Sequence, residues 1–255
     1  MAVKADNMKA VILAGGYAKR LWPLTKDKPK PLLRIAGRAI IEYVLKEIET
    51  TTDIDEIIIS TNSKFEDKFR EWLKKYKSNK KVKLIAEPTM AEGEKLGSVG
   101  ALGFLIKKIR LDEDMLIIGG DNIFEFKLKD FIGFIKKKQS SGLAFYDIKY
   151  KEKVKERYGI GVLDKNKIMI DFQEKPEKPK SSLVSTACYL FIKKDINLIN
   201  KYLEEGNNPD AMGFFISWLY KKEKVYGFVF DQPWFDIGSF ESLEQANNYF
   251  STRFK

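Results

Sequence analysis

Residues 9–33 read KAVILAGGYAKRLWPLTKDKPKPLL, and this stretch decides how the rest of the chain is interpreted. Its apolar run, Val11 to Leu13, is continuous, which is typical of a parallel strand buried on both faces. Gly15 and Gly16 follow almost at once, and they carry no side chain. A backbone without Cβ atoms allows a phosphate or a base to approach closely, so the stretch predicts a ligand loop at the end of a first strand.

Cations follow this loop at short intervals, and prolines stiffen the segment that carries them: Arg20, Lys28 and Lys30, with Pro23, Pro29 and Pro31. The stretch is not a Walker A loop, because no Gly-Lys-Ser/Thr follows, and it lacks the third glycine of a dinucleotide fingerprint. Gly15 and Gly16 alone favour an ordinary strand-to-helix turn. Together with the fixed cations they predict a site for a polyphosphate.

Composition narrows the class of function. The chain has 255 residues, which suits one large α/β domain or two small ones, and a net charge of +10. Lysine is spread along the whole chain without a nucleic-acid-binding motif, so a small anionic substrate is favoured over nucleic acid. Histidine is absent, which excludes histidine triads and histidine general bases. The single cysteine, Cys188, and the lack of a long apolar run predict a cytoplasmic protein that does not enter membranes.

Hydrophobic patterns predict alternating strands and helices in the first half of the chain. Buried strands are expected at residues 57–59, 82–86 and 115–118, and helices at 39–48, 65–76 and 97–107. This alternation indicates a Rossmann-like α/β fold with a mixed, mostly parallel sheet flanked by helices. Later strands at residues 142–148, 159–163, 167–172, 187–192 and 225–230 include short links, which predict a small antiparallel addition. We also expect helices at 195–202, capped by Asp195, at 212–220, and from Ser239 onwards.

The opening motifs resemble a known family. The run LAGGYAKRLWPLT, followed by KPKPLL, is similar to the signature L-A-G-G-x-G-x-R-L-x-P-L-T…K-P-K-P-L-L of sugar-phosphate nucleotidyltransferases, especially glucose-1-phosphate thymidylyltransferases and related NDP-sugar pyrophosphorylases. Ala18 replaces the third glycine and Lys19 a threonine or serine. The resemblance implies that Arg20 and Lys30 are catalytic cations on the triphosphate and α-phosphate. It also implies a nucleotide-binding loop formed by Leu13, Ala14, Gly15 and Gly16.

A second motif, LGSVGA at residues 96–101, resembles the L-G-T-A-G-A segment that wraps the base in this family. The resemblance assigns Gly97 and Ser98 to nucleotide binding, together with Glu87 in the Glu-Pro pair before them. A helix N-terminus with glycines for packing is an equally good reading of this motif alone. Residues 89–95, TMAEGEK, form an extra stretch without an assigned role, and the nucleotide base stays open.

A third resemblance implies a metal site. Asp121 ends the GGD segment at a strand end, and Asp236 lies in WFDIGS. In the family such residues form a two-carboxylate Mg²⁺ site, and Mg²⁺ prefers one or two carboxylates supplemented by phosphates and waters. A helix cap is the plain alternative for Asp121 alone. The matching context of Asp236 favours the metal.

Motifs in the second half resemble the sugar-phosphate site of the same family. FQEKP at residues 172–176 is similar to F-x-E-K-P, which implies that Glu174 binds sugar hydroxyls and Lys175 the sugar phosphate. Gly159 matches the glycine that leaves room for the sugar ring. STACY at residues 185–189 stands where members have N-A-G-I-Y, so that Ser185 and Ala187 replace asparagine and glycine. These replacements leave the sugar open.

The sequence therefore predicts an enzyme that joins an NTP to a sugar 1-phosphate with Mg²⁺ and releases pyrophosphate. We expect one nucleotidyltransferase domain over residues 1–255, with a nucleotide half up to residue 140 and a sugar-phosphate half at 141–255. The end of the chain soon after the last expected helix predicts that no C-terminal β-helix follows, which favours dTTP or UTP with glucose 1-phosphate. A guanylyltransferase for mannose 1-phosphate, another NTP–sugar pairing, and a non-catalytic regulatory subunit remain alternatives. Homo-oligomerisation stays open.

Overall fold

The computed structural model describes residues 8–253, and the chain forms two compact units. Unit 1 contains Met1–Lys95, Ile118–Glu125 and Pro233–Lys255, and unit 2 contains Leu96–Ile117 and Phe126–Gln232. Each unit is therefore assembled from segments that are far apart in the sequence. The division places both Asp121 and Asp236 in unit 1.

Unit 1 is built on parallel strands, in agreement with the sequence. Strands β1 (Met8–Leu13), β4 (Ile54–Asn62) and β5 (Lys81–Glu87) pair in parallel in that order. Strand β6 (Met115–Gly119) neighbours β1 in the strand order, and its last two residues belong to unit 1. Val11, Ile12 and their partners Ile58 and Ile59 are fully buried, as expected of continuous apolar runs.

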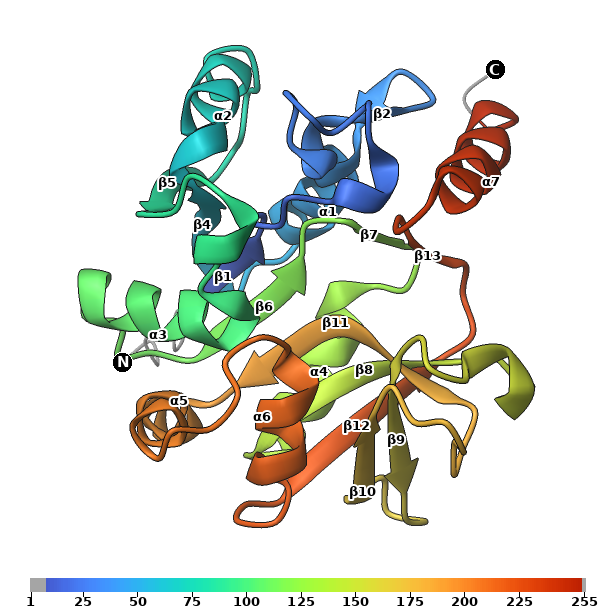
Figure 1. Ribbon diagram of the computed structural model, residues 1–255. Helices are drawn as coiled ribbons and strands as arrows, with labels where there is room; N and C mark the ends of the chain where they lie inside the picture. Colours follow the sequence, from blue (N-terminus) through green and yellow to red (C-terminus); the bar gives the residue numbers. More distant parts are fainter. Residues whose placement is uncertain (1–7, 254–255) are drawn as a thin grey trace. The chain divides into compact units, whose positions relative to one another are not determined.

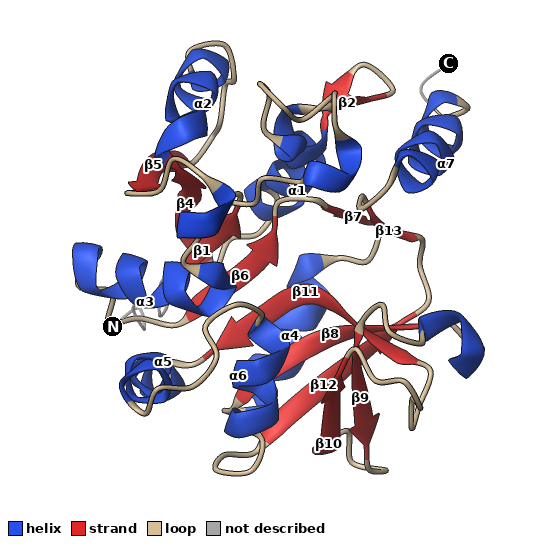
Figure 2. Ribbon diagram, in the orientation of Figure 1, coloured by secondary structure: helices blue, strands red, loops and turns tan. Residues whose placement is uncertain are grey.

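The remaining elements of unit 1 are helices, short turns and two small strand pairs, and its helices are labelled in Figures 1 and 2. The helices are α1 (Ile40–Glu49), α2 (Glu66–Leu73) and α7 (Phe240–Ser251). Short 3-10 turns are η1 (Lys19–Leu21), η2 (Lys30–Leu32), η3 (Ser63–Phe65) and η4 (Glu92–Glu94). Two small antiparallel pairs join β2 (Arg34–Ile35) to β3 (Arg38–Ala39), and β7 (Asn122–Phe124) to β13 (Trp234–Asp236).

Helix α7 is fixed by its cap and by its apolar face. The Ser239 hydroxyl accepts a hydrogen bond from the backbone N–H of Ser242, and the Ser242 hydroxyl accepts from the backbone N–H of Ser239. Ala246 and Phe250 of α7 pack in one core with Ile237 and Ile123. This core therefore holds the chain shortly after Asp121 and directly after Asp236.

The strands of unit 2 pair mainly antiparallel. Strand β8 (Ser141–Asp147) pairs antiparallel with β11 (Leu183–Phe191), which pairs with β9 (Gly159–Leu163), and β9 pairs with β10 (Met169–Glu174). On its other side β8 pairs in parallel with β12 (Val225–Phe230). The helices of this unit are α3 (Gly97–Ile109), α4 (Leu128–Lys138), α5 (Lys193–Glu204) and α6 (Met212–Leu219), and a short turn η5 spans Lys151–Val154.

The α/β class and the antiparallel addition predicted from the sequence are confirmed, but one helix was not predicted and one predicted helix cap is wrong. Helix α4 was not predicted, although its residues Leu128, Phe131 and Ile135 form a buried stripe at helical spacing. Asp195 does not cap α5: it lies within the first turn, fully buried, and accepts a hydrogen bond from the Ser141 hydroxyl at 2.5 Å. Among the described helices, none combines the length and apolarity that crossing a bilayer requires.

Candidate active site

The glycine loop follows β1 in unit 1, and neighbouring strands hold its backbone. The Ala14 N–H donates to the Ser60 carbonyl at 2.7 Å, and the Asn62 side-chain amide donates to the Gly15 carbonyl at 2.9 Å. A Cβ on Gly15 would lie 2.9 Å from Glu87 Oε1, whereas one on Gly16 would meet nothing within 4 Å. A side chain at position 15 would therefore displace the Glu87 carboxyl, and Gly16 leaves open space at the loop.

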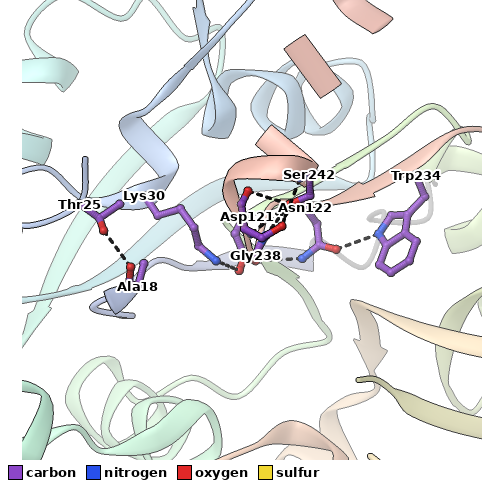
Figure 3. Close-up of polar contacts among 9 residues, drawn as sticks. Ala18, Thr25, Lys30, Asp121, Asn122, Trp234, Gly238 and Ser242 are labelled. Carbon is purple, nitrogen blue, oxygen red and sulfur yellow. Dashed lines mark hydrogen bonds and ion pairs between the residues drawn. The ribbon is translucent and has the colours of Figure 1, made fainter. Parts of the chain in front are cut away.

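Ala18 adopts a left-handed conformation, with φ 47° and ψ 43°. Its carbonyl accepts a hydrogen bond from the Thr25 hydroxyl at 2.8 Å, which ties the turn to the segment that leads to Lys30 (Figure 3). A left-handed backbone costs about 1–2 kcal/mol for a residue with a Cβ. This geometry explains why glycine is the natural residue at a turn of this kind.

Lys30 and Asp121 form an ion pair, with Lys30 Nζ 2.5 Å from Asp121 Oδ2 (Figure 3). Lys30 opens the turn η2, and Asp121 follows β6. Gly120 makes this approach feasible, because its N–H donates to the Leu13 carbonyl at 2.9 Å and a Cβ there would lie 3.0 Å from that oxygen. The glycine before Asp121 thus brings the carboxylate to the end of β1.

The charge of Asp121 is set by this pairing. Burial raises the pKa of a carboxyl, but the Lys30 ammonium and the hydrogen bonds that the carboxylate accepts outweigh that effect and lower the pKa of Asp121. One of these bonds comes from the side-chain amide of Asn122, at 2.9 Å. The Asp121 side chain keeps 30% of its exposure, so an ionised oxygen donor remains accessible to a ligand.

Asp236 and Arg20 lie in the same unit, around Gly238. The backbone N–H of Ile237 donates to the Asp121 carbonyl at 3.0 Å, and Asp236 is aligned with Asn122 in the β7–β13 pair. A Cβ on Gly238 would lie 3.3 Å from Arg20 Nη2 and 3.7 Å from Asp236 Oδ2. The structure therefore brings the segments of the two predicted metal ligands together, with a predicted catalytic cation beside Gly238.

The donor set suits a hard divalent cation. Mg²⁺ is usually held by one or two protein carboxylates, and substrate phosphates and waters complete its shell. Asp121 and Asp236 offer carboxylates of this kind on adjacent backbone segments. Among residues 8–253, no group of three or more Asp, Glu, Cys or His side chains is placed to hold a metal ion.

Glu87 ends β5 beneath the glycine loop, and it is 5% exposed. Burial raises the pKa of Glu87 to about 7, although a hydrogen bond from the Ser60 hydroxyl to Oε1, at 3.2 Å, opposes this shift. The buried carboxyl therefore titrates near neutral pH. It is also the side chain against which Gly15 packs.

In unit 2, Glu174 is enclosed by glycine backbones. A Cβ on Gly213 would lie 1.7 Å from Glu174 Oε2, and a Cβ on Gly159 would lie 3.1 Å from the same atom. Lys175 Nζ is 3.9 Å from Glu174 Oε1. Burial raises the pKa of Glu174, Lys175 lowers it, Asp210 raises it further, and the net shift is upward. Gly159, Glu174 and Lys175, which the sequence assigned together, are therefore neighbours in the structure.

Gly97 and Ser98 begin α3, also in unit 2. Gly97 has φ +76°, and a Cβ there would lie 2.3 Å from the Pro209 carbonyl, so glycine is required. The backbone N–H of Ser98 donates to the Asp210 carbonyl at 2.8 Å, and that of Val99 to the Pro209 carbonyl at 3.0 Å. These two amides of the first turn are thus engaged by another segment of the same unit.

Several residues that shape these sites were not predicted from the sequence. Gly213 and Asn62 had no motif around them, and their roles follow only from contacts with Glu174 and Gly15. Gly120 offered a signal, since a glycine at a strand end indicates a close backbone approach. That signal did not show which segment would approach.

Residues 9–253 match the family model described as nucleotidyl transferase, and the chain belongs to this family. The class of protein is that of the sugar-phosphate nucleotidyltransferases, as the resemblance in the sequence indicated. The chain is 33% identical over 242 residues to the bifunctional protein GlmU of Methanocaldococcus jannaschii, covering 95% of this chain and 54% of that protein. It is 32% identical over 193 residues to a protein of Sulfolobus acidocaldarius assigned as a mannose-1-phosphate guanyltransferase, covering 76% and 51%. The chain thus spans about half the length of these relatives.

Solved structures share the fold. A UDP-glucose pyrophosphorylase complexed with UDP-glucose matches with a TM-score of 0.79 and 20% identity, covering 97% of this chain and 99% of that one. A Bacillus anthracis protein assigned as a glucose-1-phosphate thymidylyltransferase matches with a TM-score of 0.79 and 24% identity, covering 96% and 95%. At these identities the likeness establishes the architecture and leaves the substrates to be tested.

Proposed function

We propose that this protein joins a nucleoside triphosphate to a sugar 1-phosphate, giving an NDP-sugar and pyrophosphate. The observation that supports this most strongly is the convergence in unit 1 of the open glycine loop, Lys30 and the carboxylates of Asp121 and Asp236. Phosphoryl transfer needs charge neutralisation more than covalent chemistry, and this set supplies it.

The reaction follows from the chemistry of the two substrates. An oxygen of the sugar phosphate attacks the α-phosphorus of the NTP, a new phosphoanhydride forms, and the bond to the β-phosphate oxygen breaks to release pyrophosphate. The second pKa of a phosphate monoester is about 6, so the attacking oxygen is already largely ionised at neutral pH. No general base is needed, which agrees with the complete absence of histidine.

The residues of each unit would have distinct tasks. In unit 1, Arg20 and Lys30 would bind and neutralise the triphosphate, and the backbone of residues 13–16 would contact it closely. In unit 2, Lys175 would bind the phosphate of the sugar and Glu174 its hydroxyls. Gly97, Ser98 and Glu87 would contact the nucleotide.

Asp121 and Asp236 would hold Mg²⁺, which supplies positive charge to the phosphate oxygens when it is bound. The chain's own residues orient these ligands. Lys30 and Asn122 fix the Asp121 carboxylate, and the hydrogen bond from Ile237 to the Asp121 carbonyl fixes the two segments.

The first substrates to test are dTTP or UTP with glucose 1-phosphate, followed by GTP with mannose 1-phosphate. The assigned activities of similar proteins include both thymidylyl and guanylyl transfer. Pyrophosphate release should be measured with Mg²⁺ for ATP, GTP, CTP, UTP and dTTP, each with glucose, mannose, galactose and N-acetylglucosamine 1-phosphates. Release that depends on one NTP and one sugar phosphate is expected. No release with any pair would reject the enzyme and favour a non-catalytic regulatory subunit.

A further inference from the structure

Residues 89–95, the extra stretch that the sequence left without a role, lie against the glycine loop within unit 1. The first residue of this stretch is anchored. The Tyr17 hydroxyl donates to Thr89 Oγ1 at 3.3 Å, and both side chains are buried. The Thr89 N–H donates to the Glu87 carbonyl at 2.8 Å. Loop and stretch are therefore tied together at a fixed point beside Tyr17.

Beyond Thr89 the stretch is largely exposed, and it contacts the loop a second time through an ion pair. The Glu92 carboxylate forms an ion pair with Lys19 Nζ. Lys19 lies between Ala18 and Arg20, in the loop that the proposed function assigns to the triphosphate. The Lys19 side chain is 56% exposed and the Glu92 side chain is 38% exposed.

An ion pair this exposed contributes little to stability, because solvent screens it and two long side chains must be ordered to form it. A triphosphate carries several negative charges, and its oxygens accept strong hydrogen bonds from an ammonium group. Lys19 can therefore exchange one carboxylate for a more highly charged partner at small cost. The backbone around it need not move, since the Thr25 hydroxyl already holds the Ala18 carbonyl.

We propose that Lys19 is a further triphosphate-binding residue and that Glu92 occupies its ammonium until a triphosphate displaces it. Residues 89–95 then supply a carboxylate that binds Lys19 in the absence of substrate and competes with the triphosphate for it. This inference rests on the proposed function, which supplies the triphosphate ligand.

The test measures binding of inorganic tripolyphosphate by calorimetry, at low and constant ionic strength, alongside the KM for the NTP that the substrate panel identifies. Lys19→Met should weaken tripolyphosphate binding about tenfold, because one charged hydrogen-bonding partner is lost. Glu92→Gln should strengthen it about threefold, in keeping with the small contribution of an exposed ion pair. The NTP KM should change in the same directions.

The double variant separates release of Lys19 from a general change in charge. In the Lys19→Met background, Glu92→Gln should give no further gain, because its effect acts through Lys19. An equal gain in both backgrounds would mean that removing any nearby negative charge helps, and it would overturn the proposal. Glu94→Gln is the matched control, since Glu94 lies in the same turn but accepts a hydrogen bond from the Met90 N–H at 2.8 Å. It should leave binding unchanged.

These outcomes differ from a failure of the proposed function. If the wild-type protein releases pyrophosphate but Lys19→Met and Glu92→Gln bind tripolyphosphate as the wild type does, the inference is wrong and the function stands. If no NTP is used but tripolyphosphate binding depends on both residues as described, the function fails and the inference about the loop survives.

Discussion

Asp121 in unit 1 and Glu174 in unit 2 are both acidic residues at predicted substrate sites, but their surroundings differ. Lys30 lies 2.5 Å from Asp121 and lowers its pKa, whereas Lys175 is 3.9 Å from Glu174, whose pKa is raised by burial. Among residues 8–253, no side chain or backbone group donates a hydrogen bond to the Glu174 carboxylate, while Asn122 donates one to Asp121.

The difference shows that the two units stabilise the charge of their carboxylates in different ways. Unit 1 supplies its own counter-charge, so Asp121 is ionised before any ligand binds. Unit 2 encloses Glu174 between glycine backbones and supplies only the more distant ammonium of Lys175. A ligand that donates hydrogen bonds would therefore complete the hydrogen bonding of the Glu174 carboxylate. Removing a charge from unit 1 should therefore affect the chemical step, and disturbing unit 2 should affect binding of the sugar phosphate.

The largest effect is expected from Lys30→Ala and from Asp236→Ala. Each removes a charge proposed to act on the reacting phosphates, so kcat should fall by about 10²–10³-fold or more. Circular dichroism should show that the fold persists. The measurement is pyrophosphate release with the best substrate pair, and near-normal rates in both variants would contradict the proposed roles.

Glu87 tests whether the opposite pKa shifts of Asp121 and Glu174 arise from ion pairing or from burial. It lies in unit 1, like Asp121, but among the described residues no cation is within hydrogen-bonding distance of it. Its pKa in the folded protein, about 7, exceeds its ordinary value of 4.5, so the folded state binds this proton more tightly. The resulting stabilisation is complete below pH 4.5 and is lost as the pH rises through 7.

Urea unfolding of the wild type and of Glu87→Gln measures this contribution. The free energy of unfolding of the wild type, relative to the variant, should fall by on the order of 3 kcal/mol between about pH 4.5 and pH 8.5. A pH-independent difference between the two proteins would show that Glu87 titrates at the same pH in the folded and unfolded states.

Gly213→Ala tests the surroundings of Glu174 in unit 2. The new methyl group would overlap Glu174 Oε2, so the carboxylate must leave its place. The KM for the sugar 1-phosphate should rise about tenfold, the equivalent of one lost hydrogen bond to a charged group, while the KM for the NTP stays the same.

Gly133→Ala provides the matched control, since Gly133 lies in α4 of the same unit and a Cβ there meets nothing within 4 Å. It should leave both KM values unchanged and raise stability by about 0.5–1 kcal/mol, as expected for alanine in a helix. Equal KM effects of the two variants would contradict the proposed place of Glu174.

The smallest effects are expected from Ala18→Gly and Ala187→Gly, one in each unit. Both alanines have positive φ, 47° and 53°, and both stand where the resembling motifs have glycine. Relief of the left-handed strain is offset by the extra entropy of glycine in the unfolded chain, so each variant should gain no more than about 1 kcal/mol. Thermal unfolding measures this gain, and a loss in either variant would show that the alanine methyl packs favourably there.

Much of the fold was predictable because its signals are local. Buried strands at β1, β4 and β6 appear as continuous apolar runs, and the cap of α7 appears as a serine before a helical pattern. Helix α4 was missed because its N-cap position is Lys127, which provides no side-chain cap to signal the start of a helix. Asp195 was misplaced because its partner, Ser141, lies 54 positions away, and no local pattern reports such a contact.

The sequence by itself determined that the chain has a glycine loop, fixed cations, and carboxylates in contexts resembling one family, because side-chain chemistry and backbone sterics are properties of neighbouring residues. Only the tertiary structure decided which groups meet. Lys30 and Asp121 are 91 positions apart, Glu87 lies under Gly15, and Gly213 makes room for Glu174. Such contacts depend on the packing inside each unit. Packing brings together segments that are far apart in the chain, and the local sequence around one segment does not indicate which other segment it will contact.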